Sequence, residues 1–184
     1  MTGLKLFGRA RSQANIVQSY LEELGVLYQF VLLNMGTGEH LQKSYLDLNP
    51  FGKVPGLQDG DFQLWESGAI LLCLAEKYWS LSLYERSLQN QWIYFANATL
   101  GPPQFGDVEN QESARFLKPL NAQFNTQTFL TGEALAVADI AVGATLVFAT
   151  MLAGMNYGDY PAITNYVKRL SERPAYRKVT LKQL

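Results

Sequence analysis

The sequence predicts an α+β domain followed by an all-helical domain. Two observations lead to this prediction. Up to about residue 79, short apolar runs and helix-like patterns follow one another in the order β-α-β, then β-β-α. From residue 84 onward, apolar residues recur at helical spacing alone. A linker-like Ser-Leu-Ser break lies at residues 80–82, and we therefore expect domains at 1–79 and 84–184.

The first domain is expected to begin with a strand at residues 4–7, where Leu-Lys-Leu-Phe is followed by glycine. A helix with Ser12 as its N-cap should run to residue 24, and Gly25 is a typical residue to end it. Residues 28–33 are mostly apolar and predict a second strand, parallel to the first through a right-handed crossover. A polar loop with a short helix at residues 42–47 follows.

The segment of residues 49–78 carries the strongest local signals. An extended strand is expected to end at Pro55, because proline has no N–H to donate. Asp59-Gly60, flanked by apolar runs, is a strong hairpin signal. A helix is then expected to begin with Ser67 as its N-cap. These elements complete a mixed four-stranded sheet with helices, as in the thioredoxin fold.

The second domain reads as helical throughout. Gly101-Pro102-Pro103 is expected to break the chain between its first two helices. Asp139, at the third position of the most apolar helix, can accept from the N–H three residues back, as in half of a capping box. The other half is missing because Ala136 has no side-chain acceptor. Helices are predicted at residues 84–100, 109–124, 137–153 and 161–172, with a short turn after Pro174.

Composition excludes several classes of protein. The chain has 184 residues, of which 48% are apolar, and its formal net charge of −1 gives no reason to expect nucleic acid or an anionic membrane as a partner. The single cysteine, Cys73, excludes a disulfide framework and fits a reducing compartment, so we expect a cytoplasmic protein. Residues 1–8 show no signal region. The uncharged segment 140–154 is shorter than the roughly 20 residues that span a bilayer, and we expect a buried helix.

A helix that begins beside an extended segment is suited to bind a small peptide. The N–H groups and partial positive charge at the helix start attract a carboxylate. The extended segment can pair with a peptide backbone through main-chain hydrogen bonds. Glutathione has a free carboxylate at its end and peptide bonds in its middle, and it is a ligand of this kind.

The run NPFGKVPGLQDGDFQLWESGAI resembles the glutathione-binding signature of cytosolic glutathione S-transferases. The resemblance continues through both halves and covers nearly the whole chain. It implies a thioredoxin-like glutathione-binding domain, a helical domain that forms the electrophile site, and glutathione as co-substrate without a metal. It also implies a two-fold homodimer, in which Phe51 is a candidate contact between subunits. The arginine-bearing loop is most similar to that of the chi-type bacterial class, for which isothiocyanates are characteristic substrates.

The resemblance also assigns glutathione-binding roles to individual residues. The Glu-Ser pair would bind the γ-glutamyl end, with the serine hydroxyl and N–H on its carboxylate. The valine backbone would pair with the cysteinyl residue beside a cis proline. The histidine and lysine match positions that reach the glycine carboxylate. The residues concerned are His40, Lys53, Val54, Pro55, Glu66 and Ser67.

The reaction implied by the family needs a donor that stabilises the glutathione thiolate. Lowering a thiol pKa from about 8.5 to about 6.5 requires about 2.7 kcal/mol of selective thiolate stabilisation. One or two hydrogen bonds from a hydroxyl or a guanidinium can supply it. Phe7 has no hydroxyl, whereas Ser12 lies four residues after a glycine, as in serine-type transferases. Arg9 and Arg11 are alternatives to Ser12 or act beside it.

The electrophile pocket is expected between the sheet and the first two helices of the second domain, at Tyr94, Asn97, Leu100 and Phe105. Conjugation of glutathione to isothiocyanates or aryl halides in detoxification is the predicted activity. The alternative is a non-catalytic glutathione-binding or protein-interaction module on the same fold. Cys73 lies on the apolar face of its helix, and we interpret it as packing.

Overall fold

The computed structural model describes residues 3–105 and 110–181. These residues form two compact units. The first unit holds the chain up to Tyr78 and the residues from Lys178 onward, and the second is Trp79–Arg177. Each unit is described here by itself.

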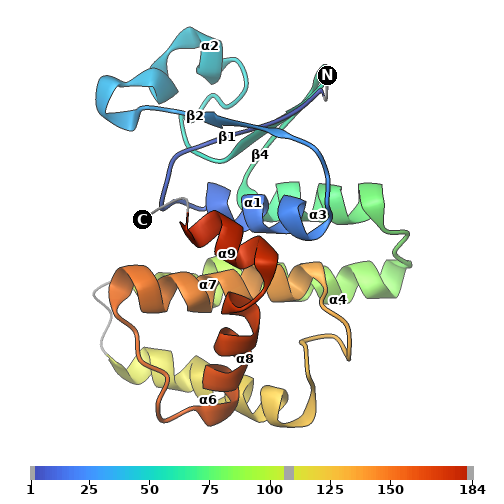
Figure 1. The fold of residues 1–184 in the computed structure, drawn as a ribbon, viewed down its shortest axis with the longest axis vertical. Helices are drawn as coiled ribbons and strands as arrows, with labels where there is room; N and C mark the ends of the chain where they lie inside the picture. The colour runs from blue at the N-terminus through green and yellow to red at the C-terminus, as the bar shows by residue number, and fades with distance from the viewer. Residues whose placement is uncertain (1–2, 106–109, 182–184) are drawn as a thin grey trace. The chain divides into compact units, whose positions relative to one another are not determined.

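The first unit is built on a mixed four-stranded sheet in the order β2-β1-β3-β4 (Figure 1). The central strand β1, Leu4–Gly8, pairs in parallel with β2, Gln29–Leu32, and antiparallel with β3, Gly56–Asp59. The edge strand β4, Phe62–Trp65, pairs antiparallel with β3. Alternate residues of β1 are buried, as expected where one face of a strand packs against helices. This sheet confirms the predicted fold class.

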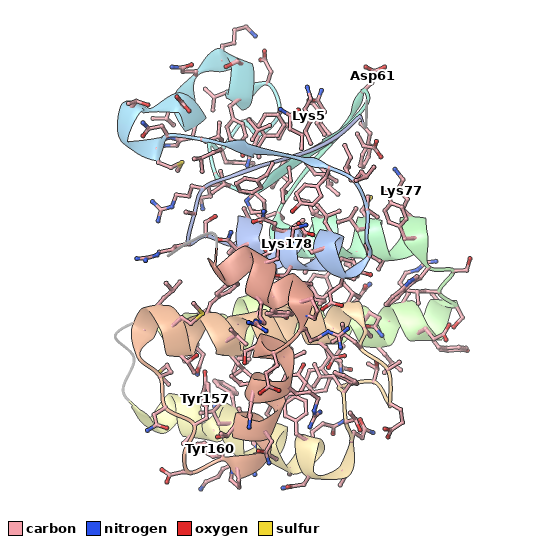
Figure 2. All side chains as sticks on the ribbon, viewed as in Figure 1. Lys5, Asp61, Lys77, Tyr157, Tyr160 and Lys178 are labelled. Atoms are coloured by element: carbon pink, nitrogen blue, oxygen red, sulfur yellow. The ribbon has the colours of Figure 1, made fainter. Side chains whose placement is uncertain are left out.

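The predicted hairpin is confirmed at its turn. Asp59 lies opposite Phe62 in the register of β3 and β4, and Gly60 between them has a φ of +61°. Glycine adopts this conformation without a steric penalty. The Lys77 ammonium forms an ion pair with the Asp59 carboxylate, and Figure 2 shows Lys77 on α3 below the hairpin tip that carries Asp61. The hairpin is therefore tied to the helix that follows it.

The prediction of a strand ending at Pro55 is wrong. β3 begins after the proline, at Gly56, and the residues that precede Pro55 are not in a strand. The physical reason is that proline cannot donate to a ladder and is therefore confined to the margin of a strand. The proline marks the start of the strand instead of its end, and the backbone before it is left outside the sheet.

Helices α1, Ala14–Glu23, and α3, Ser67–Tyr78, lie side by side on one face of the sheet, and the short α2, Lys43–Leu46, lies on the other side (Figure 1). Two 3₁₀ turns, η1 and η2, precede α2 in the loop that the sequence predicted to be polar; they span Met35–Thr37 and Glu39–Leu41. Gly25, with a φ of +64°, follows the end of α1 as predicted.

Both predicted N-caps are displaced by one residue. The N-cap of α1 is Gln13, and Ser12 precedes it, although its Oγ still accepts from the Ala14 N–H at 3.3 Å. At α3 the carbonyl of Glu66 accepts the first helical hydrogen bond, from the N–H of Ile70, so Glu66 is the N-cap and Ser67 the first helical residue. These shifts leave the two serine hydroxyls available for other contacts.

Lys178 makes a charged contact within the first unit. The Lys178 ammonium (labelled in Figure 2) lies 2.5 Å from the Glu22 carboxylate. The same carboxylate accepts from the Tyr28 hydroxyl at 2.8 Å. Glu22 therefore joins the end of α1 both to Tyr28, the residue before β2, and to Lys178.

The described secondary structure of the second unit is helical, apart from an isolated bridge between Phe129 and Gly132. Its longest apolar helix, α7, is buried over its first 13 residues, as predicted for a core helix. Phe124 and Tyr166 stack on each other with ring centroids 3.8 Å apart. The helices are α4 Leu83–Tyr94, the π-helical turn η3 Phe95–Leu100, α5 Gly101–Phe105, α6 Asn110–Thr126, α7 Val137–Ala153, α8 Pro161–Ser171 and α9 Pro174–Leu181.

The predicted break at Gly101-Pro102-Pro103 is wrong, since helical structure runs through it to Phe105. The two prolines are the second and third residues of α5. In the first turn of a helix the missing proline N–H groups remove little hydrogen bonding. The π-helical turn before Gly101 starts a new hydrogen-bond register, so the prolines stand at a helix start and not inside one.

Asp139 caps α7 as predicted, and its carboxylate also accepts hydrogen bonds from two residues outside α7 and its cap. Its carboxylate accepts from the N–H of Ala136 at 3.0 Å, from the N–H of Leu130 at 2.9 Å and from the hydroxyl of Tyr166 at 2.8 Å. The missing half of the capping box is supplied from α4, where the Gln89 side chain accepts from the Ala138 N–H at 2.9 Å. Asp139 is fully buried and has a structural role.

No helix within residues 3–105 and 110–181 is both long enough and apolar enough to cross a bilayer.

We predict that Asp139→Ala lowers the free energy of unfolding by about 3 kcal/mol or more, because three buried donors lose their acceptor. The free energy of unfolding is measured by denaturant titration followed by circular dichroism. Asp159→Ala is the matched control, since Asp159 is exposed, and it should change the value by less than about 0.5 kcal/mol. Equal effects of the two substitutions would contradict the structural role of Asp139.

Candidate functional site

A cavity of about 600 Å³ lies in the first unit, where the loops before β3 meet the starts of α1 and α3. Several of its walls are residues that the sequence analysis had singled out. It is lined by Gln13, Met35, His40, Asn49, Gly52, Lys53, Val54, Pro55 and Glu66.

The segment before β3 is held by two hydrogen bonds to one carbonyl. The Tyr45 hydroxyl donates to the Lys53 carbonyl at 2.5 Å, and the buried Asn49 amide donates to it at 2.7 Å. Burial raises the pKa of Tyr45 to about 12, so the phenol keeps its proton and remains a donor. Gly52, with a φ of +60°, turns the chain where a Cβ would lie 3.0 Å from the His40 carbonyl.

The next residue along, Val54, offers its backbone to the cavity. The Val54–Pro55 peptide bond is cis, as the resemblance implied. The Val54 N–H and carbonyl make no hydrogen bond with any residue that the structure describes. Backbone groups of this kind are strong hydrogen-bonding partners that are rarely left unpaired when covered. An extended peptide in the cavity can therefore pair with Val54.

The start of α3 forms another wall. Glu66 is exposed and has a φ of +71°, a left-handed conformation that is uncommon for a residue with a side chain. This turn brings the carboxylate to the cavity while α3 begins at the next residue. Ser67 is 1% exposed and its hydroxyl donates to the Gln13 side-chain oxygen at 3.2 Å. The first N–H groups of α3 have no partner within the helix, which suits them to bind an anion.

Two basic side chains line the cavity as well. Lys53 is exposed, and His40 is half-buried. The Nδ1 atom of His40 is buried and has no hydrogen-bond partner among the described residues. A buried polar atom without a partner is unusual in a folded protein and indicates a group that a ligand or water satisfies. The cavity thus presents basic groups for a second carboxylate.

The three residues predicted to stabilise a thiolate are not among those that line the cavity. The Ser12 hydroxyl donates to the Arg9 carbonyl at 2.7 Å. Arg9 and Arg11 are both exposed, and Arg11 has a φ of +55°. The loop is anchored by Asn15, which is 2% exposed and accepts from the Ser12 N–H at 2.9 Å. Hydrogen bonds of Ser12 and Asn15 therefore order this loop.

The predicted electrophile residues are spread over α4 and the helical segment that follows it. Tyr94 is 63% exposed, Asn97 is half-buried and Leu100 is fully buried. The side chain of Phe105 lies outside the described residues. Their role stays a prediction.

Sequence reasoning missed four of the lining residues, namely Gln13, Met35, Asn49 and Gly52. Gly52 and Asn49 carry a local signal, since they belong to the Asn-Pro-Phe-Gly turn that precedes Lys53. Gln13 and Met35 carry none, because only the folded chain brings them to the same cavity. The described residues include no group of three His, Cys, Asp or Glu side chains that could hold a metal ion.

The sequence matches the family "Glutathione S-transferase, N-terminal domain" over residues 2–76 and "Glutathione S-transferase, C-terminal domain" over residues 103–174. The chain belongs to the glutathione S-transferase family. Glutathione S-transferase 1 of Zea mays is 34% identical, with 97% of this chain and 96% of that protein covered. The disulfide-bond oxidoreductase YfcG of Escherichia coli is 29% identical, with 89% and 87% covered.

The glutathione S-transferase fold is equally clear from solved structures. The glutathione transferase URE2P6 from Phanerochaete chrysosporium, in complex with oxidized glutathione, superposes with a TM-score of 0.85 at 27% identity, covering 99% of this chain and 96% of that one. The protein is a glutathione transferase, with glutathione as its co-substrate.

Cys73 of this transferase lies in the first unit on α3 and is half-buried. Burial is the main influence on its thiol and raises its pKa. The neutral thiol is a weak nucleophile, because the thiolate is the reactive form. Cys73 therefore contributes packing.

We predict that iodoacetamide at pH 7.5 alkylates Cys73 at least about tenfold more slowly in the folded protein than in the guanidinium-unfolded chain, because burial disfavours the thiolate. Mass spectrometry over time measures both rates. Cys73→Ala should keep the conjugation rate within about twofold of the wild type. Fast alkylation that also abolishes activity would contradict a packing role.

Proposed function

We propose that this transferase conjugates glutathione to small electrophiles, with isothiocyanates or aryl halides as substrates, in detoxification. The observation that carries the proposal is the unpaired backbone of Val54, which lies in one cavity with the start of α3 and with two basic side chains. Glutathione has complementary groups: peptide bonds in its middle and a carboxylate at each end. The choice of electrophile rests on the similarity of the arginine-bearing loop to chi-type transferases.

In this proposal the tripeptide lies extended along Val54, whose N–H and carbonyl pair with the cysteinyl residue. The γ-glutamyl carboxylate binds the hydroxyl and N–H of Ser67 at the start of α3, and Glu66 faces the ammonium beside it. The glycine carboxylate lies at Lys53 and His40, where it satisfies the buried Nδ1 of the histidine when that atom carries a proton.

The chemistry requires glutathione as its thiolate. The thiolate attacks the central carbon of an isothiocyanate and forms a C–S bond, while the π bond between carbon and nitrogen breaks. The nitrogen takes up the proton that the thiol released, and the product is a dithiocarbamate. On an aryl halide, the same attack expels halide. Ser12 donates to the thiolate after its hydroxyl turns away from the Arg9 carbonyl, and Arg9 or Arg11 supplies positive charge beside it. The electrophile is proposed to bind at Tyr94, Asn97, Leu100 and Phe105.

The relative named as a disulfide-bond oxidoreductase favours a second candidate function, glutathione-dependent reduction of disulfides. It uses the same binding cavity and differs in the electrophile, which is then a sulfur atom. The test below includes a disulfide substrate to separate the two reactions. A glutathione-binding or protein-interaction module without turnover would show no rate with any of them.

We predict that Ser12→Ala lowers kcat/KM with phenethyl isothiocyanate and chlorodinitrobenzene by about 10- to 100-fold, because one hydrogen bond to an anion is lost. Arg11→Ala should lower it in the same direction. Ser171→Ala is the matched control, since its hydroxyl also donates to the carbonyl three residues earlier, and it should keep the wild-type rate.

For each protein, the rate of hydroxyethyl disulfide reduction and the affinity for glutathione, from calorimetry, are measured together with the conjugation rates. Unchanged rates in both loop variants would overturn the proposed thiolate donors. A wild-type protein that reduces the disulfide but conjugates neither electrophile would favour the second function. Absence of glutathione binding at millimolar concentration would overturn the site itself.

We further propose a two-fold homodimer in a reducing, cytoplasmic compartment. The compartment follows from the single, half-buried cysteine. Phe51 is 65% exposed, and its ring lies edge-on to Trp65 with centroids 5.1 Å apart. A large exposed ring held by a neighbour in its own unit is preorganised to enter a partner subunit.

We predict that Phe51→Ser shifts the protein from dimer toward monomer in sedimentation velocity at micromolar concentration, because an apolar anchor is removed from the interface. Leu27→Ser is the control, since Leu27 is also exposed but lies beside the opposite edge strand, and it should sediment like the wild type. A monomeric wild-type protein would refute the proposed dimer.

A further inference from the structure

Gln13 stands at the N-cap of α1 but does not cap that helix. Its side chain makes no hydrogen bond to the N–H groups of α1. Its Oε1 atom instead accepts from the Ser67 hydroxyl, 54 residues away, at 3.2 Å. Ser, Thr, Asp and Asn stabilise a helix start best, so a glutamine here uses its longer side chain for a contact outside the helix.

Gln13 also lines the cavity together with Glu66. The side chain is exposed, and its contact with Ser67 is its one side-chain hydrogen bond among the described residues. The same wall of the cavity is therefore formed by a glutamate and a glutamine, and the glutamine is hydrogen-bonded to the Ser67 hydroxyl, which is not itself among the lining residues. Glu66 and Gln13 supply acceptors. The Ser67 hydroxyl, on the first residue of α3, is the donor to Gln13.

The Ser67 hydroxyl has one proton and can donate it to one strong acceptor at a time. When a carboxylate binds at the start of α3, it competes with the Gln13 oxygen for that proton. A charged acceptor forms the stronger hydrogen bond. The Gln13 oxygen then loses its donor and must find another one in the cavity.

The γ-glutamyl group brings such a donor. Its α-carbon carries an ammonium beside the α-carboxylate, so the ammonium arrives within reach whenever the carboxylate binds at Ser67. We propose that Gln13 is a specificity-determining residue whose side-chain oxygen passes from the Ser67 hydroxyl to the α-ammonium of glutathione, which it binds together with Glu66. This inference rests on the proposed binding mode. In it, Gln13 recognises the α-ammonium of glutathione by a hydrogen bond.

The test compares glutathione with its desamino analogue, glutaryl-cysteinylglycine, in which hydrogen replaces the ammonium. Dissociation constants are measured by calorimetry for the wild type, Gln13→Met and Gln13→Glu. Methionine keeps the length of the side chain without a strong acceptor, and glutamate keeps the acceptor without the amide donors. Gln42→Met is the matched control, because Gln42 is also an N-cap without a side-chain capping bond and does not line the cavity.

Gln13→Met is expected to weaken glutathione binding by about 10- to 100-fold, the effect of one hydrogen bond to a charged group. Binding of the desamino analogue should change less than about twofold. Gln13→Glu should retain or increase the preference for glutathione over the analogue. All values for Gln42→Met should stay near those of the wild type.

Equal weakening of both ligands in Gln13→Met would overturn the inference, because the side chain would then act on the shared carboxylate. Loss of the preference in Gln13→Glu would overturn it too, since the amide donors would then be the active part. A wild-type protein that binds neither ligand would instead overturn the proposed function. Thermal unfolding midpoints show whether each variant remains folded.

Discussion

The site depends on the two hydrogen bonds that Tyr45 and Asn49 donate to the Lys53 carbonyl. They hold the backbone just before β3 outside the sheet, although its neighbour Gly56 is already paired with β1. Because Pro55 cannot donate to a ladder, β3 begins only at Gly56, and the N–H and carbonyl of Val54 remain outside the sheet. The unpaired backbone of Val54 thus depends on two side chains that bind the residue before it.

The second constraint is the abrupt start of α3. Glu66 adopts a left-handed conformation so that the helix can begin with Ser67 directly after β4. That conformation is uncommon for a residue with a side chain and persists only where the surroundings hold it. The hydrogen bond between Ser67 and Gln13 joins this helix start to α1. The cavity wall is therefore shared between two helices that are distant in sequence.

Buried polar groups play a comparable part in the second unit. The Asp139 carboxylate and the Gln89 amide satisfy backbone N–H groups at and beside the start of α7. Each replaces water at a helix end that is fully covered. In both units a polar side chain from another element forms a hydrogen bond at a helix start, with a backbone N–H at α7 and with the Ser67 hydroxyl at α3. In the second unit it serves stability alone, whereas in the first it also shapes a site.

Local signals in the sequence determined the hairpin at Asp59-Gly60, the end of α1 near Gly25 and the cap at Asp139, because each depends on the conformational preferences of a few adjacent residues. The tertiary structure alone decided on which side of Pro55 the strand lies and that helical structure passes through Gly101. It alone brought Gln13 to Ser67 and Gln89 to α7, since those contacts join residues dozens of positions apart. Chain neighbours determine which elements form, and only packing determines which side chains meet.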